Sequence, residues 1–467
     1  MPNYPMADLT LHHLTLDLFL YDLQDGLGES AAEVERKRRQ FWQGILNGQF
    51  TEATLADIKG REEALSGYIE LLPSKRLRFP PPYDGYYYPV KLGDTVSVML
   101  DCAGKPQEAS WPTLPFAEQL KHIKAGVLEH AHNIPGQMGQ SWFIWGQLPD
   151  SNQAAESTAR FIYDHLELLP SPNWFQDCRG QGRYQGATLF ELQRPDQTPD
   201  GLNRHHYALI CLFPAHLLED ELKVIVGKLY RHLIRLFHYR NKILWVYEQG
   251  FQLKTSLKAA TSTVQQLTDA LPMVITQPKL DLDCLQQNLA TALQISQPYE
   301  TNLGYFKEQA STIEVNITNY GLRLEAMEKQ DLDCDLAFLR RFEELAREKY
   351  LAQLQIDEKI LAAGFKPLEN YTKTVTGIIE IERSKNERNL NLTVALASAG
   401  LGAASLAAST FTDQAKELVA VWMPPPQGQT QPPVASYWAS TALAFFVSIS
   451  VGLLAAWITW FFLRKRR

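Results

Sequence analysis

The stretch HYALICLFP at residues 206–214 decides the fold, because one kind of structure ends here and another begins. Its first eight residues form an apolar run typical of a strand, and Pro214 has no N–H to continue a sheet ladder. Before it, apolar runs are bounded by glycine and proline. After it, the chain changes to long stretches with helical spacing. We therefore predict a mixed α+β or α/β domain over residues 1–215 and a long-helix stalk over residues 216–390.

Strand and helix patterns recur within residues 1–215. Three further runs read as strands: TVSVMLDC (95–102), SWFIWGQL (141–148) and YQGATLFELQR (184–194). The last of these and the 206–213 run are separated by turn-forming residues, which indicates an antiparallel hairpin. The segment ESTARFIYDHLELL (156–169) has the spacing of an amphipathic helix.

The stalk reads as three helical runs, over about 216–270, about 280–329 and from Asp331 onward. The third run keeps one apolar face by steps of three and four residues. We expect Gly364 and Pro367 to interrupt it, with a new helix starting at the proline. Helices this long bury little in a lone globule, so they indicate a bundle, a coiled coil or an oligomeric stalk.

The C-terminal region contains two long stretches without a formal charge, 389–412 and 418–463. A helix needs about 20 apolar residues to cross a bilayer, which predicts one transmembrane helix at 391–411 and a second at 438–463. Residues 412–437 then form an external loop and residues 464–467 a basic cytoplasmic tail. Basic residues flank the outer ends of both spans and predict cytoplasmic N- and C-termini in a multi-pass protein of the plasma (inner) membrane.

This order of elements resembles the CorA-type two-span metal transporters, in which a cytoplasmic domain and long helices lead into two C-terminal spans. The resemblance implies a homo-oligomer, a pentamer in that family, and a pore lined by the first span. It also implies a divalent cation such as Mg²⁺. The family's Gly-Met-Asn signature is absent, and the corresponding stretch reads STFTDQ (409–414). Divergent CorA-like proteins include membrane effectors of type III CRISPR defence that a nucleotide messenger gates.

The first predicted span has one face of small or polar residues. Polar residues within spans usually face a bundle interior or water, so this face is a candidate pore lining. The alternative is close packing of helices through small residues, which needs no conduction. The candidate pore-lining residues are Asn391, Ser398, Gly402, Ser405, Ser409 and Thr412.

Charge and motifs in the sequence also bear on nucleic-acid binding, metal binding and enzymatic activity. A formal net charge of −7 argues against direct nucleic-acid binding, and five scattered cysteines indicate neither disulfides nor a zinc cluster. Acidic residues around the repeated DLDC (281–284 and 331–334) could bind divalent cations at subunit interfaces, or simply form a solvated helix face. No phosphate loop, HExxH or GxSxG motif is present, and we predict no enzymatic activity.

One segment combines basic and aromatic side chains, SKRLRFPPPYDGYYY at residues 74–88. Such side chains could hold the phosphate and the ring of a nucleotide, whereas the alternative is an ordinary proline-bounded turn. The candidate ligand-binding residues are Lys75, Arg76, Arg78, Tyr83 and Tyr86.

The sequence thus favours an oligomeric, CorA-like cation channel or transporter that its cytoplasmic domain gates. The alternative is a membrane-anchored scaffold or signalling protein whose two spans only tether and oligomerise it.

Overall fold

The computed structural model describes residues 9–24, 26, 29–46, 51–62, 67–103, 114–132, 136–168, 171–197, 203–277, 281–385, 415–419 and 434–465. By contact, the chain divides into two compact units. The first unit comprises Met1–Thr263 and Gln297–Phe365, and the second comprises Val264–Ser296 and Lys366–Arg467.

One mixed sheet organises the first unit. In the described residues its spatial order is β2-β4-β5-β1-β6-β9-β8-β7, with β3 paired to β4, and β6 and β9 run parallel while the other pairs are antiparallel. The strands are β1 (His12–Leu23), β2 (Ile69–Glu70), β3 (Leu77–Arg78), β4 (Asp84–Leu92), β5 (Thr95–Ala103), β6 (Gly139–Gln147), β7 (Cys178–Tyr184), β8 (Ala187–Gln197) and β9 (Asn203–Phe213).

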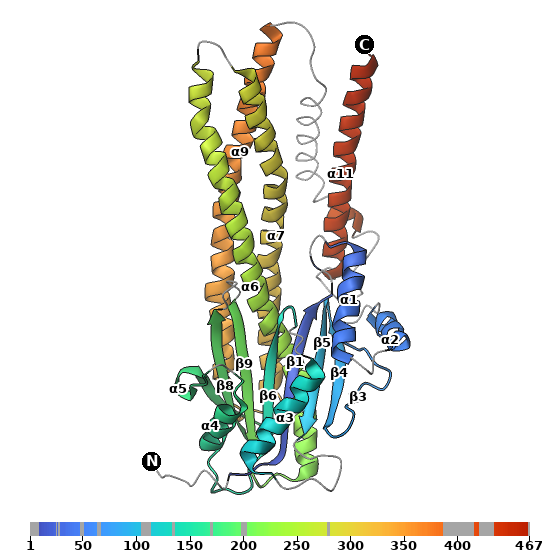
Figure 1. Ribbon diagram of the computed structural model, residues 1–467, viewed down its shortest axis with the longest axis vertical. Coiled ribbons are helices and arrows are strands. Elements are labelled where there is room, and N and C mark those ends of the chain that lie inside the picture. The colour runs from blue at the N-terminus through green and yellow to red at the C-terminus, as the bar shows by residue number, and fades with distance from the viewer. Residues whose placement is uncertain are drawn as a thin grey trace. The chain divides into compact units, whose positions relative to one another are not determined.

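The helices fall into a short set before β9 and a long set after it (Figure 1). The short helices are α1 (Ala31–Leu46), α2 (Glu52–Glu62), α3 (Phe116–Ala131), α4 (Ala155–Leu166) and α5 (Trp174–Asp177). After β9 come the long helices α6 (Glu219–Ile275), α7 (Leu282–Glu328), α9 (Ala352–Lys385) and α11 (Val434–Lys465). The short α8 (Ala337–Leu345) and a π-helical turn (Ala346–Leu351) lead into α9.

Strand β1 shows why the sheet is covered on both faces. Its residues alternate between two hydrophobic cores, because successive side chains of a strand point to opposite faces. Leu16 and Leu18 pack in the core formed with α1, α2, α3 and α4. Phe19 and Tyr21 pack in the core formed with α6, α7 and α8. The first unit is therefore a three-layer α+β structure, and β1 lies at its centre.

Several sequence predictions are confirmed. The expected strands correspond to β5, β6, β8 and β9, and β8 and β9 pair antiparallel as the hairpin prediction required. The segment predicted as a helix contains α4. An α+β N-terminal region and long helices are present, as the sequence indicated.

The expected third helical run needs two corrections. Its helix begins at Ala337 rather than Asp331, because Asp335 exchanges two backbone hydrogen bonds with Arg183 of β7 (2.9 and 2.8 Å). The predicted break at Gly364 and Pro367 is wrong, since α9 continues through both. Gly364 instead permits close packing, because a Cβ there would lie 3.0 Å from the Tyr299 hydroxyl.

The prediction of two transmembrane helices is also contradicted. Within the ranges that the structure describes, no helix has both the length and the apolar character needed to cross a bilayer. The prediction rested on long stretches without a formal charge, and these stretches also contain Ser and Thr, whose hydroxyl groups are costly to remove from water. The membrane and ion-channel interpretations therefore have no support among the described helices. The predicted first span, 391–411, lies outside the described residues.

Candidate functional site

A cavity of about 390 Å³ lies between the edge of the sheet and the first turns of α6. Its volume falls in the range usual for small-molecule sites. The sheet side contributes residues of β2, β4, β5 and the turn after β2, and α6 contributes residues spaced by three or four positions, which places them on one helix face. The lining residues are Tyr68, Glu70, Lys75, Arg76, Tyr88, Met99, Lys223, Val224, Gly227, Lys228, Tyr230, Arg231 and Ile234.

The lining is strongly cationic, with five basic side chains and one carboxylate. Two of the basic side chains are neutralised locally: Lys75 pairs with Glu70 at 3.1 Å and Lys223 with Glu219 at 2.8 Å. The other three are Arg76, Lys228 and Arg231. Among the described residues, no carboxylate lies within ion-pair distance of any of them. The cavity thus presents positive charge that the folded chain does not pair.

The sheet wall of the cavity is held in place by hydrogen bonds. The hydroxyl groups of Tyr68 and Tyr88 lie 2.7 Å apart, and the Tyr88 hydroxyl donates to Glu70 Oε1 at 3.0 Å. The Arg235 guanidinium lies 4.1 Å from the centre of the Tyr68 ring. Burial, together with the neighbouring Tyr68 hydroxyl and the Glu70 carboxylate, raises the pKa of Tyr88 far above its ordinary value. These tyrosines therefore remain neutral and act as rigid walls with polar edges.

Gly227 opens the helical wall. It lies inside α6, where glycine costs about 1 kcal/mol relative to alanine, yet a Cβ built there would meet no atom within 4 Å. Packing therefore does not explain the glycine. The missing side chain leaves the helix backbone accessible from the cavity.

Beneath the cavity lies a buried pair of carboxyl groups. Asp17 of β1 and Asp101 of β5 are directly opposite in the antiparallel register, and both are buried. The Tyr230 hydroxyl lies 2.8 Å from Asp17 Oδ2 and 3.0 Å from Asp101 Oδ2. Trp145 Nε1 donates to the same hydroxyl at 2.8 Å. Tyr230 thus connects the carboxyl pair to the cavity that it lines.

The structure separates the five ligand-binding residues expected from the sequence. Lys75 and Arg76 line the cavity, and Tyr86 lies under Arg76, whose guanidinium is 4.4 Å from the ring centre. Arg78 and Tyr83 are not among the lining residues, and Tyr83 stacks on His122 of α3 at 4.9 Å.

The sequence interpretation missed the α6 half of the site. Lys223, Lys228 and Arg231 lie in one short segment, so a basic cluster at the start of a long helix was a readable signal. Asp17 and Asp101 also left a signal, because each is a carboxylate within an otherwise apolar strand pattern. Neither signal says which distant segment completes the site.

The other sites predicted from the sequence, a pore lining and a cation site, have less structural support than the cavity. The expected pore-lining residues (Asn391, Ser398, Gly402, Ser405, Ser409 and Thr412) all lie outside the described residues. In the described ranges, no group of three or more His, Cys, Asp or Glu side chains could hold a metal ion. Within the second DLDC, Asp331 accepts a hydrogen bond from the Gln185 N–H, and Asp335, which follows the motif, joins β7.

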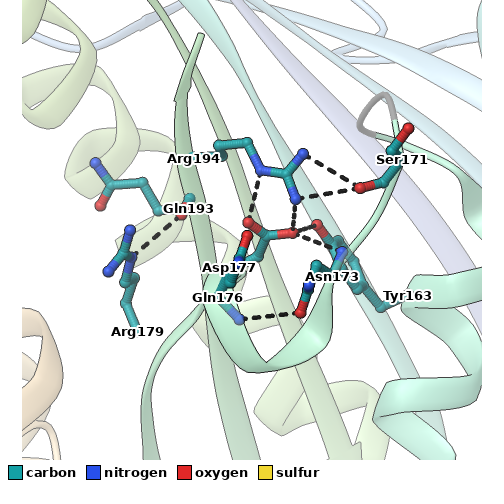
Figure 2. Close-up of polar contacts among 8 residues, drawn as sticks. All are labelled: Tyr163, Ser171, Asn173, Gln176, Asp177, Arg179, Gln193 and Arg194. Atoms are coloured by element: carbon teal, nitrogen blue, oxygen red, sulfur yellow. Dashed lines mark hydrogen bonds and ion pairs between the residues drawn. The ribbon is translucent and has the colours of Figure 1, made fainter.

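Another buried carboxylate, Asp177 of α5, is hydrogen-bonded by its neighbours (Figure 2). It accepts hydrogen bonds from Arg194 Nε at 2.7 Å, the Tyr163 hydroxyl at 2.6 Å and the Asn173 N–H at 2.9 Å. Burial acts to raise the pKa of Asp177, but the hydrogen bonds from Arg194 and Tyr163 hold this pKa below its ordinary value. This network therefore anchors α4, α5 and β8, and the Asp177 carboxylate has a structural role.

Comparison with known proteins gives no assignment. No protein-family model matches the chain, and no match is found among curated proteins or solved structures. The resemblance to CorA-type transporters accordingly stays a prediction.

Proposed function

We propose that the first unit is a receptor for a phosphorylated ligand of the nucleotide class, bound in the cavity between the sheet edge and α6. One observation carries the proposal. Arg76, Lys228 and Arg231 converge on a cavity of about 390 Å³ without carboxylate partners among the described residues. A cluster of unpaired cations is unfavourable through mutual repulsion, and a bound anion relieves it.

The lining residues suit both parts of such a ligand. Guanidinium groups bind phosphate through two parallel hydrogen bonds, and the ammonium group of Lys228 adds a mobile positive charge. Tyr68 and Tyr88 offer ring surface for a base, and Met99 and Ile234 add apolar contact. An anion without a ring would use only the cationic part of this lining.

Binding would also act on α6. More than half of the lining residues come from this helix, and the rest come from the sheet edge. A ligand that contacts both sides stabilises their association by its own binding free energy. Because α6 runs from Glu219 to Ile275 as one helix, ligand occupancy at its start is suited to a regulatory role.

Calorimetric titration of the full chain with three probes tests the proposal: adenosine triphosphate, inorganic pyrophosphate and adenosine. We expect the triphosphate to bind most tightly, pyrophosphate less tightly and adenosine not measurably. Affinity for the triphosphate should fall as salt is raised, because screening weakens exposed charges. Equal affinity for the triphosphate and pyrophosphate would reject the nucleotide class, and no binding of either would reject the receptor.

Three substitutions locate the site. Arg231→Ala removes a charged hydrogen-bond donor worth about 1.5–3 kcal/mol, which corresponds to a loss of roughly 10- to 150-fold in affinity. Gly227→Trp fills the cavity and should abolish binding. The matched control is Lys258→Ala, which removes an exposed cation from α6 outside the cavity. If Lys258→Ala weakened binding as much as Arg231→Ala, the anion would be held by general helix charge and not by the cavity.

A further inference from the structure

The contacts of the Asp17 and Asp101 carboxyl groups require a proton between them. The Tyr230 hydroxyl carries one hydrogen but lies within hydrogen-bond distance of an oxygen of each carboxyl group, at 2.8 and 3.0 Å. Trp145 Nε1 already donates to this hydroxyl. Ionised carboxylates only accept hydrogen bonds. Both contacts can be hydrogen bonds only if one carboxyl group is protonated and donates.

The burial of the pair also indicates that it holds a proton. Asp17 is fully buried, and its Oδ1 has no hydrogen-bond partner among the described residues. Two ionised carboxylates side by side in such a place would repel each other strongly. Burial first, and then the neighbouring Asp101 charge, raises the pKa of Asp17 well above its ordinary value. Burial raises the pKa of Asp101 to about 6.

The pair faces titratable and charged groups from every neighbouring element. Tyr86 of β4 and Tyr230 of α6 both have a pKa raised far above the ordinary value, mainly by burial, so they stay neutral in the range where the pair titrates. Trp145 of β6 does not titrate. Cys102 follows Asp101 on β5, and burial raises the pKa of its thiol above the ordinary value. Arg76 is a nearby cation, and its charge acts to lower the pKa of both Asp101 and Tyr86.

Arg76 is therefore shared between the pair and the cavity. It lines the cavity, stacks on Tyr86 and lies close enough to Asp101 to favour ionisation of that carboxyl group. When the pair loses its proton, the added negative charge competes with an anionic ligand for Arg76 and lowers the positive potential of the cavity. When an anion binds, its charge makes the protonated pair more favourable.

We propose that anion binding in this cavity is linked to protonation of the Asp17–Asp101 pair, so that the bound state takes up a proton. The inference rests on the proposed function and adds its regulation. Affinity should be highest in mild acid and fall as pH rises through the titration of the pair. A shift of one pKa unit between the free and bound states corresponds to a tenfold change in affinity.

The test is calorimetric titration of the full chain with adenosine triphosphate in two buffers that differ in ionisation enthalpy, at several pH values from 5 to 8. The difference between buffers gives the protons taken up on binding. Wild type is compared with Asp101→Asn, whose amide imitates the protonated carboxyl group. The comparison cancels proton uptake by the phosphate itself. We expect the wild type to take up more protons on binding than Asp101→Asn. Between pH 5 and pH 8, the affinity of the wild type should fall about tenfold more than that of the variant.

Two further variants keep the result interpretable. Asp17→Asn should behave like Asp101→Asn, so failure of one variant to fold leaves the other to decide. Asp57→Asn removes an exposed carboxylate of α2 and should keep the wild-type proton uptake. Equal proton uptake by wild type and the pair variants would overturn the linkage while the receptor function stands. Absence of triphosphate binding to the wild type would overturn the proposed function, and the linkage with it.

Discussion

The shared proton has a consequence for stability that needs no ligand. A carboxyl group whose pKa is higher in the folded than in the unfolded state binds more protons when folded, so stability falls as pH rises between the two values. The pKa of Asp101 rises from 3.8 to about 6 in the folded protein, mainly through burial. The loss of stability that Asp101 contributes should therefore begin near pH 4 and be complete somewhat above pH 6.

The size of the effect follows from this shift. About two pKa units correspond to about 3 kcal/mol, and Asp101 is only 8% exposed, so solvent screens little of it. Asp101→Asn removes the titration of residue 101 and keeps a neutral hydrogen-bonding group opposite Asp17 and Tyr230. We expect the variant to match wild type near pH 4 and to exceed it by up to about 3 kcal/mol at pH 8.

The free energy of unfolding of both proteins is measured by urea unfolding, followed by circular dichroism, at pH 4, 6 and 8. Groups that titrate in both proteins contribute equally and drop out of the difference between them. Asp57→Asn on α2 serves as the control and should follow wild type at each pH. A variant that is less stable than wild type at pH 8, with a difference that does not change with pH, would show that the pKa of Asp101 is not raised in the folded protein.

Three further substitutions test other parts of the structure. Gly227→Ala should raise the free energy of unfolding by about 0.5–1 kcal/mol in urea melts, because a Cβ there meets no atom within 4 Å; a loss of stability would show that the helix wall is tighter than described. Arg194→Gln should cost about 3–5 kcal/mol at pH 7, since it leaves the Asp177 charge buried and unpaired. Because the pKa of Asp177 is lowered in the fold, with burial opposed by its hydrogen bonds, this difference should shrink as pH falls below about 4; a pH-independent cost would contradict it. Lys254→Met should lower unfolding stability and leave triphosphate affinity unchanged, because its 2.6 Å ion pair joins α6 to α9 outside the cavity; a change in affinity would extend the site to this pair.

Local patterns in the sequence were enough to predict most elements of the first unit. Alternating apolar residues marked β5, β6, β8 and β9, and the 206–214 junction separated the sheet from the long helices. These signals are local, because strand and helix periodicity depend on neighbours within a few residues. Pro367 shows the limit of local signals: its preference for a helix break is overridden in α9, where the Tyr299 ring stacks on Phe365 beside Gly364.

Half of the candidate site was visible in the sequence, as Lys75 and Arg76 beside several tyrosines. The other half was decided by tertiary structure, which brings α6 against the sheet edge and places Lys228 and Arg231 opposite those residues. Strand register likewise sets Asp17 opposite Asp101 across 84 positions of chain, and α6 then adds Tyr230 between them. The reason is physical: periodicity fixes which face a residue occupies, whereas the free energy of packing the whole chain selects which distant face it meets.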